Sequence, residues 1–292
     1  MNILITGGSG FLGSKLALDL SSLGHEVSLL LRPTSRLDRI GVRESEFIIG
    51  RAASDDEIQG FVVRVSPDVI VHTACSYGRR GESLLELYDA NYRFGLLVLQ
   101  AAMASKKPVT FINTGTILAP HINHYALTKH HFSQAGQLLA TAHGSDLRFI
   151  NVLLQHMYGP GDDVTKFTTH VIRACRNNIV DLDLTAGTQT RDFIYIDDVA
   201  SAYVKILERA ETFGPSANVE VGSGVAPPVR DFVETAHRLT GSSTRLNFGA
   251  LPFRTNEAMH CQADISQLTA LGWAPEFDLE AGIQKILETE MW

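Results

Sequence analysis

A glycine-rich turn near the start of the chain constrains the fold more than any other segment. An apolar run over residues 2–6 is typical of a strand, and Gly7, Gly10 and Gly13 follow it at three-residue spacing. Residues 14–23 then carry apolar side chains at helical intervals. Glycines between a strand and a helix let the backbone approach a pyrophosphate, whose charge is stabilised by the amides at the helix N-terminus. The segment predicts a dinucleotide site, and a purely structural turn is the alternative. The predicted contacts are Gly7, Gly10, Phe11, Leu12 and Gly13.

Strand-like and helical segments alternate through the first half of the chain. The expected strands cover residues 2–6, 26–31, 47–50, 69–73, 109–113 and 149–155, and the expected helices cover residues 14–23, 55–65, 82–105 and 125–142. This alternation is typical of an α/β protein with helices on both faces of a parallel sheet, which binds ligands at the carboxyl ends of its strands. We therefore predict a Rossmann-type doubly wound parallel sheet.

Composition excludes several classes of protein. Of the 292 residues 45% are hydrophobic, but the longest apolar stretches are far shorter than the ~20 residues of a membrane helix. Met1 leads directly into the first strand without a basic region, so we expect no signal peptide and a cytoplasmic location. The three cysteines and eleven histidines lack the spacing of disulfide or metal frameworks, so no metal is predicted. A net charge of −7 disfavours nucleic acid as a partner.

Three polar residues downstream form a candidate catalytic group. Thr114 ends the fifth expected strand, and Tyr125 and Lys129 are separated by one turn of the next helix. A ketone that accepts hydride develops negative charge on its oxygen, and Tyr125 is the candidate proton donor for that oxygen. An unperturbed phenol has a pKa near ~10, so we expect the neighbouring Lys129 to lower it. An ordinary helical pair with a snorkelling lysine is the alternative.

Further motifs occur in the order found in a known family. They are residues 7–13, His72-Thr73-Ala74, Asn91, Thr114, residues 125–129, residues 158–161 and Arg191-Asp192-Phe193. On these motifs the chain, from residue 1 to about 290, resembles the extended short-chain dehydrogenases/reductases that act on nucleotide sugars. Residues 112–116, 156–162 and 248–254 are similar to those of its nucleotide-sugar 4-ketoreductases. The resemblance implies that Lys129 also binds the nicotinamide ribose, and that Thr73 and Ala74 contact the cofactor.

The residues after Thr114 separate the reactions known in this family. Dehydratases of the family carry an Asp-Glu pair there, whereas this chain has Gly115 and Thr116. Elimination of water then lacks an acid and a base of suitable strength. Carbonyl reduction and reversible 4-epimerisation remain.

Cofactor preference is predicted from the loop after the second strand. Arginine in this loop accommodates a 2′-phosphate, whereas an acidic residue binds the ribose hydroxyl of NAD. Arg32, Ser35 and Arg36 form a possible phosphate clamp, so we predict NADP (NADPH), with NAD less favoured. Two solvated loop arginines are the alternative. Near the third strand, Gly50-Arg51-Ala52 replaces the acidic residue that faces adenine in the family, which puts that contact in doubt.

The resemblance also implies a set of substrate-binding residues. Arg191 and Arg254 match the contacts of the family to the nucleotide-sugar diphosphate and ribose, although Arg191 could instead pair with Asp192 or Asp198. His156 stands where many relatives carry a substrate-contacting asparagine, and a buried structural histidine is the alternative. The remaining predicted substrate contacts are Arg79 and Thr116, with Arg80 beside Arg79 as a weaker candidate.

Together these features predict two domains and one function. Residues 1–158 plus about 193–215 would form an NADP-binding Rossmann domain, and residues 159–192 plus 216–292 a smaller α/β domain for the nucleotide sugar. By resemblance, helices 82–105 and 125–142 would pair in a homodimer, and burial by the sheet of the monomer is the alternative. We expect an NADPH-dependent 4-ketoreductase of a nucleotide-linked 6-deoxyhexose, in deoxysugar biosynthesis for a surface polysaccharide such as O-antigen. An NAD-dependent nucleotide-sugar 4-epimerase is the first alternative, and a non-catalytic NADP sensor is the second.

Overall fold

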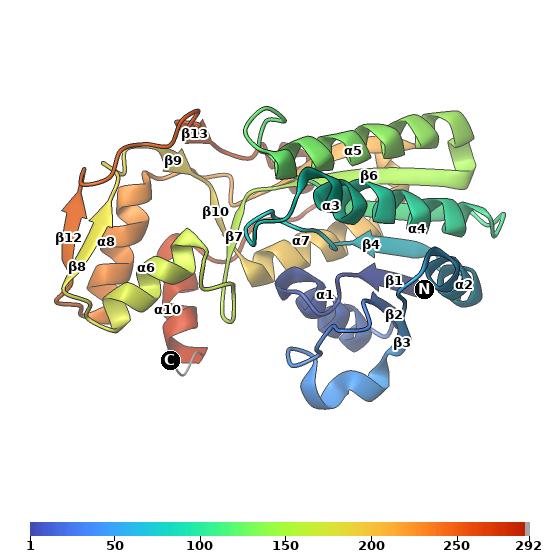
Figure 1. The fold of residues 1–292 in the computed structure, drawn as a ribbon, viewed down its shortest axis with the longest axis horizontal. Coiled ribbons are helices and arrows are strands. Elements are labelled where there is room, and N and C mark those ends of the chain that lie inside the picture. Colours follow the sequence, from blue (N-terminus) through green and yellow to red (C-terminus); the bar gives the residue numbers. More distant parts are fainter. Residues whose placement is uncertain (290–292) are drawn as a thin grey trace. The chain divides into compact units, whose positions relative to one another are not determined.

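The computed structural model describes residues 1–289, which divide into two compact units (Figure 1). Unit 1 comprises Met1–Leu153 and Tyr203–Val219, and unit 2 comprises Leu154–Ala202 and the residues from Glu220 onward. No helix within residues 1–289 combines the length and the hydropathy needed to cross a membrane.

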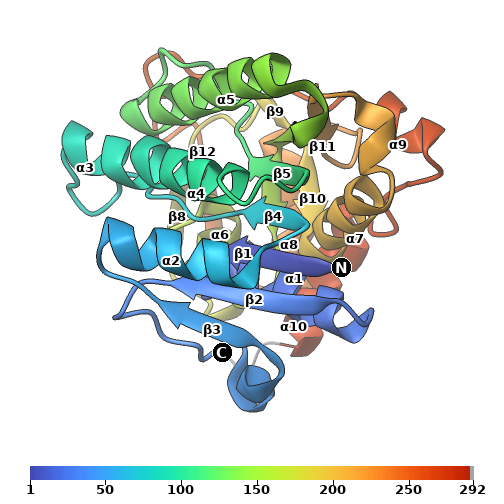
Figure 2. The same cartoon turned by 90° about the vertical axis from the view of Figure 1, so that its right-hand side faces the viewer.

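The sheet of unit 1 has seven strands in the order β11-β6-β5-β4-β1-β2-β3 (Figure 2). Their bounds are β1 (Asn2–Thr6), β2 (Glu26–Leu31), β3 (Ile48–Arg51), β4 (Val69–His72), β5 (Val109–Thr114), β6 (Leu147–Leu154) and β11 (Ser216–Val221). The first six pair in parallel, as predicted. The seventh strand was not predicted as part of this sheet, because its residues had been assigned to the second domain. It lies parallel to β6, with hydrogen bonds from the amides of Phe149 and Gln155 to the carbonyls of Pro215 and Val221.

Helices cover both faces of this sheet (Figure 2). The helical elements are α1 (Phe11–Ser22), η1 (Gly41–Glu46), α2 (Asp55–Val65), α3 (Leu84–Tyr88), η2 (Asp89–Arg93), α4 (Phe94–Met103), α5 (His124–His143), η3 (Gly144–Asp146) and η4 (Ala210–Phe213). The apolar faces of α2, α4 and α5 pack on strand residues such as Leu4, Ile70 and Phe111, which are almost fully buried. Burial of this face is the main stabilising contribution to the unit. The doubly wound fold class is therefore confirmed.

One predicted helix differs from expectation. Residues 82–105 were expected to form one regular helix, but the helical run begins at Leu84 and contains the π-helical turn Asp89–Arg93. Such turns often mark functional positions, because the extra residue re-aims side chains. Here the turn holds Asn91, which is fully buried.

Unit 2 consists of three short strand pairs and a set of packed helices (Figure 1). The parallel pairs are β7 (His156–Tyr158) with β10 (Phe193–Tyr195), β8 (Asp181–Leu184) with β12 (Arg245–Phe248), and β9 (Thr190–Arg191) with β13 (His260–Cys261). The helices are α6 (Phe167–Arg176), α8 (Val229–Thr240), α9 (Ser266–Ala270) and α10 (Leu279–Thr289), and α7 (Ile196–Glu208) begins in this unit and ends in unit 1. Phe232 on α8 is central to the core, since its ring lies 4.7 Å from that of Phe193 and 5.8 Å from that of Tyr158.

Two helical glycines of unit 1 should respond in opposite directions to alanine. A Cβ at Gly136 on α5 would lie 2.2 Å from the Phe149 ring, so Gly136→Ala should destabilise by roughly 1–3 kcal/mol through overpacking. A Cβ at Gly60 on α2 would meet no atom within 4 Å, so Gly60→Ala should stabilise by about 0.5–1 kcal/mol. Urea unfolding of both variants measures the effects, and a Gly136→Ala variant at least as stable as the wild type would show that the packing of α5 is misassigned.

Candidate active site

The glycine-rich turn has the geometry of a phosphate-binding turn. Gly7 has a φ of +74°, which favours glycine, and it lies so close to the segment after β4 that a Cβ would be 2.6 Å from the nitrogen of Ala74. A Cβ at Gly13 would lie 2.2 Å from the Gly7 carbonyl oxygen, so this glycine permits close packing of helix and strand. Gly10 is the N-cap of α1 and provides no capping side chain. The amides of the first turn are therefore suited to a pyrophosphate.

The neighbouring strand end supports this turn. The Thr73 hydroxyl and amide both donate to the carbonyl of Thr6, at 2.8 and 3.2 Å. Thr73 and Ala74 therefore lie against Gly7, where the sequence predicted cofactor contacts. Their contact with a cofactor stays a prediction.

Thr114 and Tyr125 each bond to another hydroxyl group of unit 1. The Thr114 hydroxyl lies 2.7 Å from the phenol oxygen of Tyr203, which comes from α7. Tyr125, in the first turn of α5, forms a hydrogen bond with the Thr116 side chain. Thr116 is buried, and its hydroxyl also accepts from the Leu118 amide at 3.2 Å. The sequence did not predict Tyr203, because 89 residues separate it from Thr114.

The pKa of Tyr125 is raised above its ordinary value, which corrects the expectation that Lys129 lowers it. Burial is the main cause, and the neighbouring Cys75 adds to it. The Thr116 hydrogen bond and the Arg79 charge act in the opposite direction by stabilising the phenolate. The wrong expectation considered only the helical spacing of the two residues and omitted desolvation. Tyr125 is therefore a neutral phenol at neutral pH, which can donate a proton.

Lys129 is a buried cation. It is 1% exposed, and burial lowers its pKa. Its ammonium has no hydrogen-bond or carboxylate partner among residues 1–289, although Cys75 lies close enough to stabilise the charge. An isolated buried ammonium is unfavourable unless a ligand supplies acceptors. The ribose hydroxyls assigned to Lys129 by the family resemblance are acceptors of this kind.

Asn91 orders the loop that faces Tyr125. Its amide nitrogen donates to the Ser76 carbonyl at 2.9 Å and to the Thr128 hydroxyl at 3.0 Å, and its oxygen accepts from the Ser76 amide at 2.7 Å. The next residue of the loop, Tyr77, places its ring 5.0 Å from that of Tyr125. Arg79 in turn lies 5.1 Å from the centre of the Tyr77 ring. The π-helical turn thus fixes the loop that carries Arg79, for which substrate binding stays a prediction.

The predicted phosphate clamp is an exposed turn after β2. Arg32 and Arg36 are exposed and Ser35 is partly exposed. Arg36 pairs with Asp38 at 3.0 Å, but both side chains are more than two-thirds exposed, so the pair is weak. The clamp residues can therefore bind an anion without breaking a buried interaction.

In unit 2, His156 and Arg191 are electrostatic neighbours. Burial, together with the positive charges of Arg191 and Lys166, lowers the pKa of His156 to about 4. Its Nδ1 is buried and has no partner among the described residues. A neutral imidazole with an unsatisfied ring nitrogen fits both a ligand contact and the structural alternative.

Arg191 is paired, but not with either predicted carboxylate. Its guanidinium donates to Glu257 and, at 2.7 Å, to the Thr190 carbonyl. Asp192 instead accepts bonds from Ser223, Gly224 and Ala263, and Asp198 accepts from the amides of Glu276 and Phe277. The suggested pairing with Asp192 or Asp198 was therefore wrong. Arg254 is exposed, three residues before Glu257.

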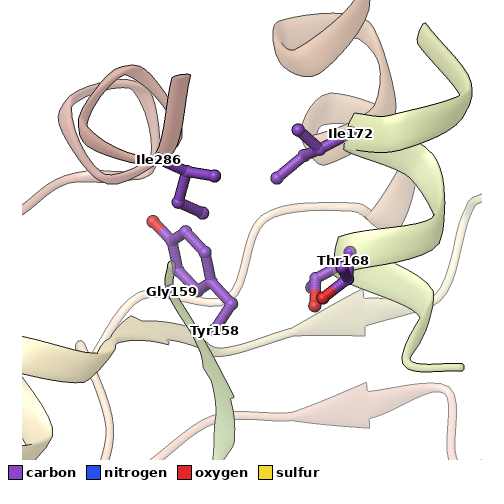
Figure 3. A pocket seen from close by; sticks show the side chains of 6 residues that line it. Tyr158, Gly159, Thr168, Ile172 and Ile286 are labelled. Carbon is purple, nitrogen blue, oxygen red and sulfur yellow. The ribbon is translucent and has the colours of Figure 1, made fainter. Parts of the chain in front are cut away.

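Tyr158 of the 158–161 motif packs inside unit 2 (Figure 3). Its ring lines a gap with Thr168, Ile172 and Ile286 that has no room for a water molecule. A Cβ at Gly282 would lie 2.1 Å from the Tyr158 hydroxyl, so α10 approaches this ring closely. The motif therefore stabilises the core of unit 2, and this gap is no substrate pocket.

Known proteins resemble this chain in sequence and in fold. Residues 3–222 match the NAD dependent epimerase/dehydratase family. The chain is 33% identical to CDP-abequose synthase of Salmonella typhimurium over 98% of its own length and 97% of that protein. It is 26% identical to dTDP-L-rhamnose 4-epimerase of Burkholderia thailandensis, over 97% and 93% of the two chains. A UDP-glucose-4-epimerase of Stenotrophomonas maltophila with bound NAD and formylated UDP-arabinopyranose has the same fold, with a TM-score of 0.86, 20% identity and coverage of 99% and 97%.

Tyr203 should affect catalysis only through Thr114. Tyr203→Phe removes one hydrogen bond, worth about 1 kcal/mol, so kcat should fall about fivefold. In steady-state assays, the Thr114→Val variant should lose more, and adding Tyr203→Phe to it should cause no further loss. Additive losses would show that Tyr203 has a role independent of Thr114.

His156 should make the stability of the protein depend on pH below neutrality. The unfolded imidazole binds a proton near pH 6.5 and the folded one only near pH 4, so the free energy of unfolding should fall as pH decreases between these values. The full effect is about 3 kcal/mol. His156→Asn should therefore lose less stability on acidification than the wild type, as measured by denaturant unfolding. The exposed His121→Asn serves as the control, and equal slopes for His156→Asn and wild type would contradict the assignment.

Proposed function

We propose that this chain, which belongs to the NAD dependent epimerase/dehydratase family of extended short-chain dehydrogenases/reductases, reduces the 4-keto group of a nucleotide-linked 6-deoxyhexose with NADPH. The arrangement around Tyr125 carries this proposal. A neutral phenol is hydrogen-bonded to Thr116, and Gly115 and Thr116 occupy the places of the acidic pair that dehydration requires. The full-length similarity to CDP-abequose synthase supports a CDP-linked sugar as the substrate class.

The residues of the chain suit the cofactor. The Gly7 and Gly13 positions would not accept a Cβ, and Lys129 is a buried residue whose ammonium has no hydrogen-bond partner among residues 1–289. We assign the pyrophosphate to the amides at the start of α1 and the nicotinamide ribose to Lys129. The exposed arginines after β2 favour NADP over NAD. When bound, NADPH supplies the hydride.

The proposed reaction needs one proton from the protein. As C4 of the sugar gains hydride, its carbonyl oxygen gains the proton of the Tyr125 hydroxyl, so the ketone becomes an alcohol and Tyr125 a phenolate. Thr116 and Arg79 stabilise that phenolate, because both favour the charged form. Thr114, held by Tyr203, is assigned to the same sugar oxygen. Proton uptake from solvent restores the phenol.

Unit 2 is assigned to the nucleotide part of the substrate. Arg191, Arg254 and His156 would bind the diphosphate and ribose, since guanidinium groups bind phosphates in a bidentate manner. In this assignment unit 1 is the NADP-binding domain. We place the reaction in the cytoplasm. Its product would serve deoxysugar biosynthesis, for example for an O-antigen.

A homodimer is part of the proposal. A shallow groove of about 440 Å³ lies on α3, the π-helical turn and α5, lined by Tyr88, Tyr92, His131, Gln134, Ala135 and Leu138. Leu138 is 72% exposed and Leu85 on α3 is 77% exposed. Apolar side chains this exposed are suited to contact with a second copy.

The assay of first choice supplies NADPH or NADH with 4-keto-6-deoxyglucose linked to CDP, dTDP or GDP, and follows nicotinamide absorbance. Rapid oxidation of NADPH with one of these sugars is expected. Tyr125→Phe should lower kcat about 100-fold or more while NADPH binding is retained, because it removes the proton donor.

Tyr92→Phe is the matched control, since this tyrosine lies in the groove and outside the site, and its kcat should equal that of the wild type. The epimerase would replace the reductase as the proposed function under one combined outcome. In that outcome no keto sugar is reduced, the protein carries bound NAD, and it interconverts a UDP-hexose pair. NADP binding with neither reaction would support the sensor.

A further inference from the structure

The loop after β2 is a tight turn. The Ser35 amide donates to the Arg32 carbonyl at 3.0 Å, and Pro33 occupies the second position of the turn, where its fixed φ is favourable. The turn presents Arg32 and Ser35 from a backbone only four residues long. Its conformation therefore decides where these side chains point.

Arg51 binds the backbone of this turn. It is the last residue of β3, opposite Leu31 in the sheet register. Its Nη1 donates to the carbonyl oxygens of Ser35, Pro33 and Arg32, at 2.8, 3.1 and 3.5 Å. One guanidinium thus contacts three of the four carbonyls of the turn, although Arg51 as a residue is exposed. The family resemblance explains no such contact, because it places an acidic residue here.

Positive charge gathers at the same place. Arg39 lies 5.8 Å from the centre of the Phe11 ring, at the first residue of α1. Arg36 has only the exposed Asp38 as a partner, and Arg32, Arg39 and Arg51 have no carboxylate partner among residues 1–289. In a chain of net charge −7, these four arginines make the segment around the turn locally positive, which favours the binding of an anion there.

We propose that Arg51 is a positioning residue for the 2′-phosphate of NADP. It holds the turn so that Arg32 and the Ser35 hydroxyl meet the phosphate, and it does so from the strand end where relatives place an acidic residue. This inference rests on the NADP preference proposed above, and it identifies a residue that determines this preference. A residue with only a structural role would affect NADPH and NADH equally, whereas Arg51 should affect NADPH selectively.

The test is cofactor binding by Arg51→Met, measured by calorimetry with NADPH, NADH, 2′,5′-ADP and 5′-AMP. We expect the Kd of NADPH and of 2′,5′-ADP to rise about tenfold, equivalent to about 1.4 kcal/mol, while the Kd of NADH and of 5′-AMP stays unchanged. Arg43→Met is the matched control, because Arg43 is a half-exposed arginine that pairs with Glu46 and contacts no residue of the turn, and it should bind all four ligands as the wild type does.

A second variant covers the possibility that Arg51→Met does not fold. Pro33→Gly loosens the same turn without altering any charge, and it should also weaken NADPH binding selectively. The role of Arg51 would be overturned if the variants bound NADPH and NADH more weakly by the same factor. It would also be overturned if the affinity for NADPH were unchanged in both variants. Equal affinity of the wild type for NADPH and NADH would overturn it together with the NADP preference. Neither result would affect the ketoreductase proposal, whose assay detects hydride transfer from either cofactor.

Discussion

A row of polar side chains, buried except at Asn218, crosses the sheet just below its carboxyl edge, and the candidate site depends on it. Thr6 bonds to His72 at 2.8 Å, Asn113 to Asn151 at 2.8 Å, and Asn151 to Asn218 at 2.8 Å. The strand register places Thr6 opposite His72, His72 opposite Asn113, and Asn113 opposite Asn151. A slip of one residue would move this row to the other face and break its bonds. The row therefore fixes the ends of β1 and β4, directly before Gly7 and Thr73, and in β5 it lies one residue before Thr114, the last residue of that strand.

Much of this architecture could be predicted because its signals are local. Strand and helix periodicity located the first six strands, and the glycine spacing located the phosphate-binding turn. The seventh strand was missed because Ser216–Val221 pairs with β6 only after the chain has passed through unit 2. A polar, partly exposed edge strand of this kind has no continuous apolar run to reveal it.

The candidate site was predictable in its residues but not in its electrostatics. Tyr125 and Lys129 were found from their spacing, yet the direction of the pKa shift of Tyr125 depends on burial and on Cys75, which comes from another loop. Tyr203 was not predicted either, because its hydrogen bond to Thr114 joins residues that are distant in sequence. Contacts between distant residues leave no periodic pattern in a single sequence.

The two units satisfy their cations differently, and this difference bears on how each would take a ligand. Lys129 in unit 1 is buried without an acceptor, so a ribose hydroxyl would add hydrogen bonds without breaking any. Arg191 in unit 2 already binds Glu257 and the Thr190 carbonyl, so a diphosphate would have to share or replace these partners. Glu257 belongs to the same turn as Arg254, since its amide donates to the Arg254 carbonyl at 3.1 Å. A diphosphate at Arg191 would therefore compete with a carboxylate from the turn that contains Arg254, the second predicted arginine.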